Sequence, residues 1–110
     1  MAHQVIDANE VEASHGVFRG LTAPLGVSAF KINRLELPAD GEGPEHDHSS
    51  NSEQEVYAII AGSGTLRVDG EEVELRPGLF VYCSPEARRQ MRAGAEGLVW
   101  IGIGATSTDV

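Results

Sequence analysis

Short apolar runs, separated by glycine, proline and other turn residues, alternate along most of this chain. Their length and their alternation are typical of β-strands. Between two of them, Asp69-Gly70 predicts a two-residue type I′ hairpin turn. The expected strands are Phe30 to Leu37, Val56 to Ala61, Thr65 to Val68, Glu71 to Leu75, Leu79 to Cys83, Arg88 to Ala93 and Leu98 to Gly102.

A helical stripe is missing from the pattern, and Val11 to Ser14 form the short segment where we expect a helical turn. Many short strands with turns between them indicate an all-β sandwich or barrel. The first residues are expected either to fray or to add an edge strand to a partner. The small, polar tail from Ala105 to Val110 is expected to fray.

A chain of 110 residues is long enough for one hydrophobic core, so we expect a single domain over residues 1–110. No apolar run approaches the roughly 20 residues of a membrane span, and the first residues do not resemble a secretory signal. Cys83 is the only cysteine, which excludes an intrachain disulfide and favours a cytoplasmic location. Its thiol is expected to be a small buried apolar group.

The net charge of −9, with 8 Lys and Arg against 17 Asp and Glu, argues against nucleic acid as a partner. A phosphate-binding surface needs a basic face, and this composition offers no obvious one. The overall charge does not exclude a small anionic ligand, because one local arginine can override it.

Two of the four histidines, His46 and His48, are separated by one residue after a glycine-rich turn. On a strand, side chains alternate between two faces, so both imidazoles would point the same way. Two imidazoles and a carboxylate form a common open metal site. Glu53 and Glu55 follow at the same strand parity, and either could supply the carboxylate.

The stretch from Gly41 to Gln90 resembles the cupin superfamily, specifically small single-domain proteins with the cupin 2 conserved barrel. The first motif is Gly41, the His46-x-His48 pair, Glu55 and then Gly62 after six residues. The second comprises Pro77-Gly78, Pro85 and Arg89. The resemblance implies a double-stranded β-helix (jelly-roll) barrel with its core at about residues 27–104, the two ends being peripheral. It also implies one divalent metal ion inside the barrel.

Three departures from the family pattern concern the site. Six residues separate His48 from Glu55, where the family has three or four, so Glu53 remains the alternative carboxylate. Arg89 occupies the position of the last histidine of the family and cannot coordinate a cation. Leu79 follows Pro77-Gly78, where the family often has aspartate.

Two functions from different classes remain open. In the first, His46, His48 and Glu55 hold iron, manganese, nickel or zinc. Arg89 then anchors a small anionic metabolite, and Tyr57 and Met91 line the pocket by strand parity. Such a protein would be a metal-dependent enzyme, for example a dioxygenase, an isomerase or an epimerase. In the second, Arg89 pairs with a glutamate, no metal is bound, and the protein is a ligand-binding or sensor module without catalysis.

A homodimer is the expected assembly. The apolar strand at Leu98 to Ile101 suggests an edge that needs covering, and small cupins are commonly homodimers. We expect Trp100 to lie in the core or in a dimer contact.

Overall fold

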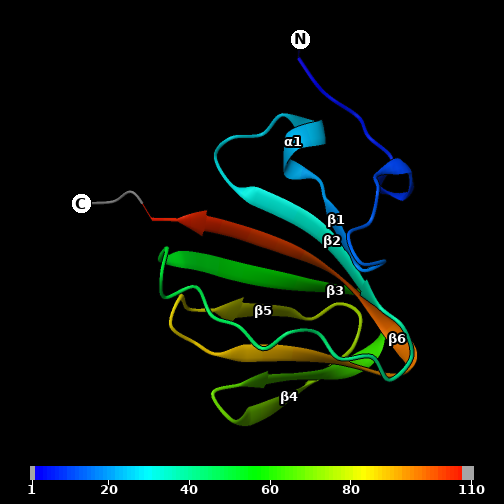
Figure 1. Cartoon of the computed structure of the whole chain (residues 1–110), viewed down its shortest axis with the longest axis vertical. Coiled ribbons are helices and arrows are strands. Elements are labelled where there is room, and N and C mark those ends of the chain that lie inside the picture. Colours follow the sequence, from blue (N-terminus) through cyan, green and yellow to red (C-terminus); the bar gives the residue numbers. More distant parts are fainter. Residues whose placement is uncertain (1, 108–110) are drawn as a thin grey trace.

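The computed structural model describes residues 2–107 and consists almost entirely of antiparallel strands (Figure 1). Besides a 3₁₀ turn at Ala8–Glu10 and a short helix α1 at Thr22–Leu25, it contains six strands. No helix among the described residues is long and apolar enough to cross a membrane. The strands are β1 (Phe18–Gly20), β2 (Lys31–Leu37), β3 (Glu53–Val68), β4 (Glu71–Leu75), β5 (Phe80–Cys83) and β6 (Arg89–Thr106).

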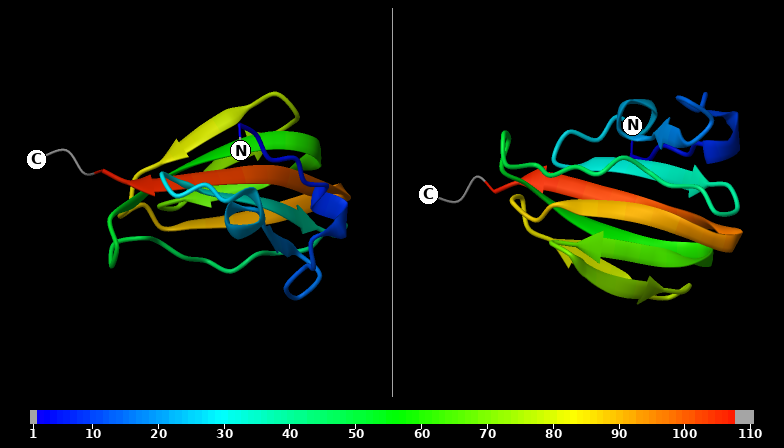
Figure 2. Two further views of the ribbon diagram at one scale, coloured as in Figure 1. Left: turned by 90° about the horizontal axis from the view of Figure 1, so that it is seen from above. Right: turned by 60° about the horizontal axis from the view of Figure 1, so that its bottom comes forward.

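The two longest strands, β3 and β6, pair with each other along nearly their whole length and bend together. The register shifts twice between Ile59 and Gly64, opposite the stretch of β6 from Ala93 to Trp100. At this bend the ribbon turns back on itself, so that its two arms lie in facing layers (Figures 1 and 2). This arrangement is the predicted jelly-roll barrel.

The larger layer has the strand order β1-β2-β6-β3-β5, formed with the second half of β6 and the first half of β3. In the smaller layer, the other two arms pair with each other and β4 extends the β3 arm. An extended segment before β3 runs beside the β6 arm through isolated bridges, Glu42 to Arg92 and His46 to Arg89. The core between the layers includes Leu37, Ile59, Leu66, Leu98 and Trp100.

The predicted hairpin at Asp69-Gly70 is confirmed, since both residues have the positive φ of a type I′ turn, 47° and 86°. The expected strands Val56 to Ala61 and Thr65 to Val68 are parts of a single strand, because β3 continues through Gly62-Ser63-Gly64. A Cβ on Gly62 would lie 2.1 Å from the carbonyl oxygen of Gly97. The glycine therefore permits a close backbone approach at the bend.

Other expectations also need correction. The helical turn expected at Val11 to Ser14 does not form; the 3₁₀ turn ends earlier, at Glu10, and the Asp7 side chain caps it. Strand β1 and helix α1 were not predicted, because three or four residues are too few for a detectable period. Leu98 to Ile101 are not an edge, since β2 and β3 occupy both sides of this part of β6. The tail is still paired at Thr106, and residues 108–110 lie outside the described part.

Candidate metal and ligand site

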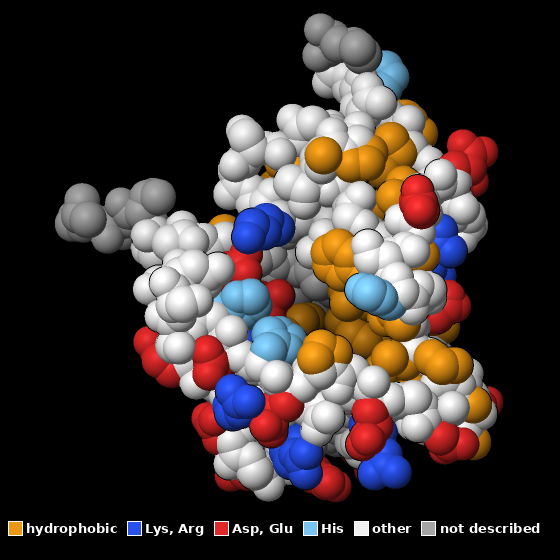
Figure 3. Space-filling view, in the orientation of Figure 1, with side chains coloured by type: hydrophobic (Ala, Val, Ile, Leu, Met, Phe, Trp, Pro, Cys, Tyr) orange, Lys and Arg blue, Asp and Glu red, His pale blue; other side chains and the backbone are white. Residues whose placement is uncertain are grey.

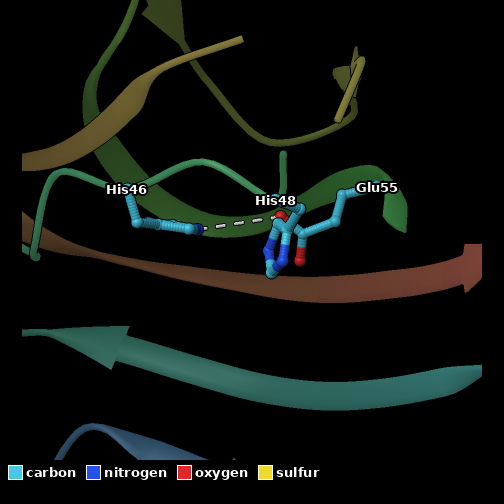
Figure 4. Close-up of side chains that lie close together, drawn as sticks. All are labelled: His46, His48 and Glu55. Atoms are coloured by element: carbon cyan, nitrogen blue, oxygen red, sulfur yellow. Dashed lines mark ion pairs between the residues drawn. The ribbon is translucent and has the colours of Figure 1, made fainter. Parts of the chain in front are cut away.

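The histidine pair lies on the extended segment that borders the β6 arm. His46 and Arg89 exchange two backbone hydrogen bonds, both of 2.9 Å, and the amide of His48 donates to the Pro85 carbonyl at 2.8 Å. The sequence suggested a regular strand here. The segment instead forms only isolated bridges, but these hydrogen bonds keep it extended. The two rings meet edge to face with centroids 5.3 Å apart, and both lie against Glu55 (Figure 4).

One oxygen of Glu55 is the point on which the site converges. Its Oε1 lies 3.2 Å from Nε2 of His48 and 3.8 Å from Nε2 of His46. The same oxygen accepts hydrogen bonds of 2.5 Å from the Tyr57 hydroxyl and from Nη2 of Arg89. All the ion pairs and hydrogen bonds described for this carboxylate fall on Oε1.

These contacts change the acidity of the groups. Burial alone would raise the pKa of Glu55, but hydrogen bonds from His46, Tyr57 and Arg89 lower it to about 2. The hydrogen bond to Glu55 raises the pKa of His46 above its ordinary value. Burial, followed by the Glu55 contact, raises the pKa of the Tyr57 hydroxyl. Glu55 is therefore an anion at any ordinary pH and is ready to hold a cation.

Arg89 faces inward, with only 1% of the residue exposed, while Arg88 points outward. Nη1 of Arg89 donates to the carbonyls of Ser84 and Ala87, and Nε donates to Tyr57. Together with the bond to Glu55, these contacts occupy four of the five N–H groups that a guanidinium carries.

Glu53, the alternative carboxylate, lies on the other side of His48. Its Oε2 is 3.1 Å from Nδ1 of His48, and its Oε1 is 3.6 Å from Nζ of Lys31. The residue is only 5% exposed and packs over Gly104, where a Cβ would come within 2.8 Å of the carboxylate. A carboxylate on the far nitrogen fixes the orientation and tautomer of an imidazole that holds a metal through the other. Glu53 is therefore placed to orient His48.

Among the described residues, His46, His48 and Glu55 offer ligand atoms that all lie within 4.8 Å of one another. A metal with bond lengths of about 2.1 Å holds neighbouring ligand atoms roughly 3.0–3.4 Å apart. The two His–Glu separations are close to that range, so small side-chain movements would complete the site. Two imidazoles and one carboxylate suit iron, manganese, nickel or zinc and leave positions open for another molecule.

The site opens into a cavity of about 390 Å³ between the layers. Figure 3 shows a hollow with histidine side chains at one edge and hydrophobic side chains at the other. Tyr57 and Met91 line this cavity, as strand parity predicted. Sequence reasoning missed the other lining residues, because their positions depend on a strand register that the sequence does not determine. They include Lys31, Asn33, Trp100, Gly102 and Gly104.

Comparison with solved structures supports the fold over the whole length of the chain. A cupin protein from Bacteroides fragilis is 22% identical, with a TM-score of 0.84 over 100% of this chain and 89% of that one. A cupin 2 conserved barrel domain protein from Salinispora arenicola is 19% identical, with a TM-score of 0.78 over 97% and 90% of the two chains. A predicted oxalate decarboxylase from Thermotoga maritima is 18% identical, with a TM-score of 0.79 over 94% and 100%.

At these identities, the structural likeness establishes the fold alone. A sequence comparison with curated proteins found no match. The family model for the cupin domain, however, matches residues 33–104, which include both histidines, Glu55 and Arg89. The chain therefore belongs to the cupin family.

Proposed function

We propose that this cupin binds one divalent metal ion through His46, His48 and Glu55 and that a small anionic molecule binds at that ion. The observation that carries the proposal is the convergence of these three donors at the wall of a cavity. A bound ion would supply Lewis-acid chemistry by polarising an oxygen of that molecule. Metal-dependent oxygenase or isomerase activity stays a prediction.

The charges around the cavity favour an anion. Glu55 pairs with Arg89, and Glu53 pairs with Lys31, so the four side-chain charges cancel. With neutral imidazoles, a bound dication would leave an excess of two positive charges in a partly buried site. An anionic ligand would neutralise that excess and gain strength from the low local dielectric.

Arg89 acts on this anion mainly as a fixed positive charge behind Glu55. Its remaining N–H, on Nη2, is the one it could offer to a ligand directly. By holding Oε1 of Glu55, it also keeps the carboxylate in one orientation. The T. maritima neighbour is named a predicted oxalate decarboxylase, and oxalate is an anion, which is consistent with an anionic ligand for the present chain.

Elemental analysis of protein purified without a histidine tag tests the metal site. We expect close to one equivalent of metal, either as purified or after incubation with iron, manganese, nickel or zinc. His46→Ala should lose most of it, whereas the matched control His15→Ala, at an exposed histidine outside the cavity, should keep it. Less than about a tenth of an equivalent with no uptake, or full metal content in His46→Ala, would refute the proposal.

The alternative function is a metal-free ligand-binding or sensor module. The pairing of Arg89 with Glu55 favours it, because this is the contact that such a module would use to neutralise the carboxylate. In that case the two imidazoles would hydrogen-bond the ligand directly. A protein that takes up no metal but binds small anions would fit this alternative.

We further propose that the partner of this chain is a second copy of itself. On the outer face of the larger layer, cross-strand register aligns Ile103 with Val56 and Tyr82, and Ile101 with Ala58 and Phe80. Phe80 and Tyr82 are 74% and 58% exposed. A flat apolar face of this kind can cover the same face of a second molecule about a two-fold axis.

A further inference from the structure

The cavity has a polar end and an apolar end, and strand register creates both. Across β2, β6 and β3, the inward residues form successive rows. Lys31, Gly104 and Glu55 make the first row, and Asn33, Gly102 and Tyr57 make the second. Both of these rows are polar at their two sides and have glycine in the middle.

The next row along the same strands is apolar. It contains Leu35 and Trp100, with Phe18 of β1 beside Leu35, and all three side chains line the cavity. Met91, from the facing layer, lines it as well. The first row and this one are four positions apart along β2, which corresponds to about 13 Å of extended chain.

Gly102 leaves the floor between these ends open, whereas the Glu53 side chain covers Gly104. A Cβ on Gly102 would meet Leu35 Cδ1 at 3.6 Å and Tyr57 Cδ1 at 3.8 Å, both ordinary contact distances. A side chain at this position would therefore be tolerated by the protein but would fill part of the cavity. Because no side chain stands there, one molecule can lie along the floor from the polar rows to the apolar row.

We propose that the ligand of this site is an amphipathic anion, with its charged head at His46, His48 and Glu55 and its apolar body over Leu35 and Trp100. The proposal rests on the proposed function for the position of the head. The apolar end adds a requirement that a small, fully polar anion does not meet. Burying that body excludes water from the row around Trp100, and each buried methylene would strengthen binding up to about fourfold.

Calorimetric titration with acetate, butanoate, hexanoate and octanoate tests the proposal. Affinity should rise at least twofold per methylene until the cavity is full. Trp100, the only tryptophan, should report occupancy of the apolar end through a fluorescence change with the longer acids. Hexan-1-ol, which lacks the charge, should bind more weakly than hexanoate. Equal affinity for acetate and octanoate, or binding of neither, would overturn the proposal.

Two neighbouring substitutions on β6 separate cavity filling from general damage. Gly102→Ala places a methyl group inside the cavity, so it should weaken octanoate about tenfold and leave acetate nearly unchanged. Ile103→Ala, on the opposite face, should change neither affinity. Equal weakening of both acids by Gly102→Ala would contradict the proposed position of the apolar body.

The same titrations with EDTA-treated protein separate this inference from the metal proposal. A chain-length gradient in protein that takes up no metal would support the apolar body and refute the metal as the anchor of the head. Full metal uptake without any gradient would refute the amphipathic ligand and leave the metal site standing.

Discussion

Removal of the guanidinium of Arg89 should strongly destabilise the metal-free protein. Arg89→Met keeps a similar length but leaves the partly buried Glu55 without its cation and leaves two carbonyls without donors. Removing one partner of a buried ion pair costs about 3–5 kcal/mol. This is a large part of the roughly 5–15 kcal/mol that stabilises a typical domain.

The assay is urea unfolding of EDTA-treated protein, followed by circular dichroism at one fixed protein concentration. Arg88→Met is the matched control, because Arg88 is the adjacent residue, its side chain is 55% exposed and it pairs with Glu45 at the surface. It should lose less than about 1 kcal/mol. Arg89→Lys keeps the charge but lacks the planar donors, and it should fall between the two.

A loss of less than about 1 kcal/mol in Arg89→Met, equal to that of Arg88→Met, would refute the reasoning. It would mean that the guanidinium contributes no more than a surface charge and that Glu55 finds another partner. If Arg89→Met does not fold at all, Arg89→Lys still gives a measurable difference from the control.

Three further predictions concern acidity, orientation and assembly. The pKa of Glu55 is lowered in the folded state, from about 4.5 to about 2, so its ionised form stabilises the folded protein. EDTA-treated protein should lose this stability as the pH falls from about 4.5 towards about 2. Urea midpoints across this range should fall more steeply for the native chain than for Glu55→Gln; parallel curves would contradict this. Gly104→Ala should push Glu53 away from His48 and weaken metal binding about 10- to 100-fold in a chelator competition assay. Unchanged affinity would exclude an orienting role for Glu53. Phe80→Asp should convert a dimer into a monomer in sedimentation velocity, and a native chain that is already monomeric would exclude the proposed interface.

The local chemistry of the fold was predictable from the sequence, but the path of the long strands was not. Asp69-Gly70 identifies its turn because only a few residue pairs accept two positive φ angles. The sequence predicted a strand that ends at Ala61, whereas β3 continues and bends at Gly62, where the backbone of Gly97 packs closely. That neighbour is far away along the chain, so no local pattern could reveal it.

Some residues of the candidate site were likewise predictable from the sequence and others were not. His46, His48 and Glu55 could be found because their residue types and spacing carry the chemistry. Lys31 and Gly104 could not, because their places depend on how β2 aligns with β6. Glu53 and Glu55 have the same strand parity, so the sequence could not distinguish them. The structure shows that Glu53 contacts Nδ1 of His48 and that Glu55 contacts Nε2.

The continuous course of β3 and β6 through both layers has a consequence for folding. Neither layer has a complete set of strands without these two, so neither can melt while the other remains intact. We also expect the pairing to grow from Val68 and Arg89, the paired ends that are nearest in sequence, towards Glu53 and Thr106, and to be slow because these contacts are far apart in sequence. Amide hydrogen exchange in the two arms should therefore report one shared opening free energy rather than two.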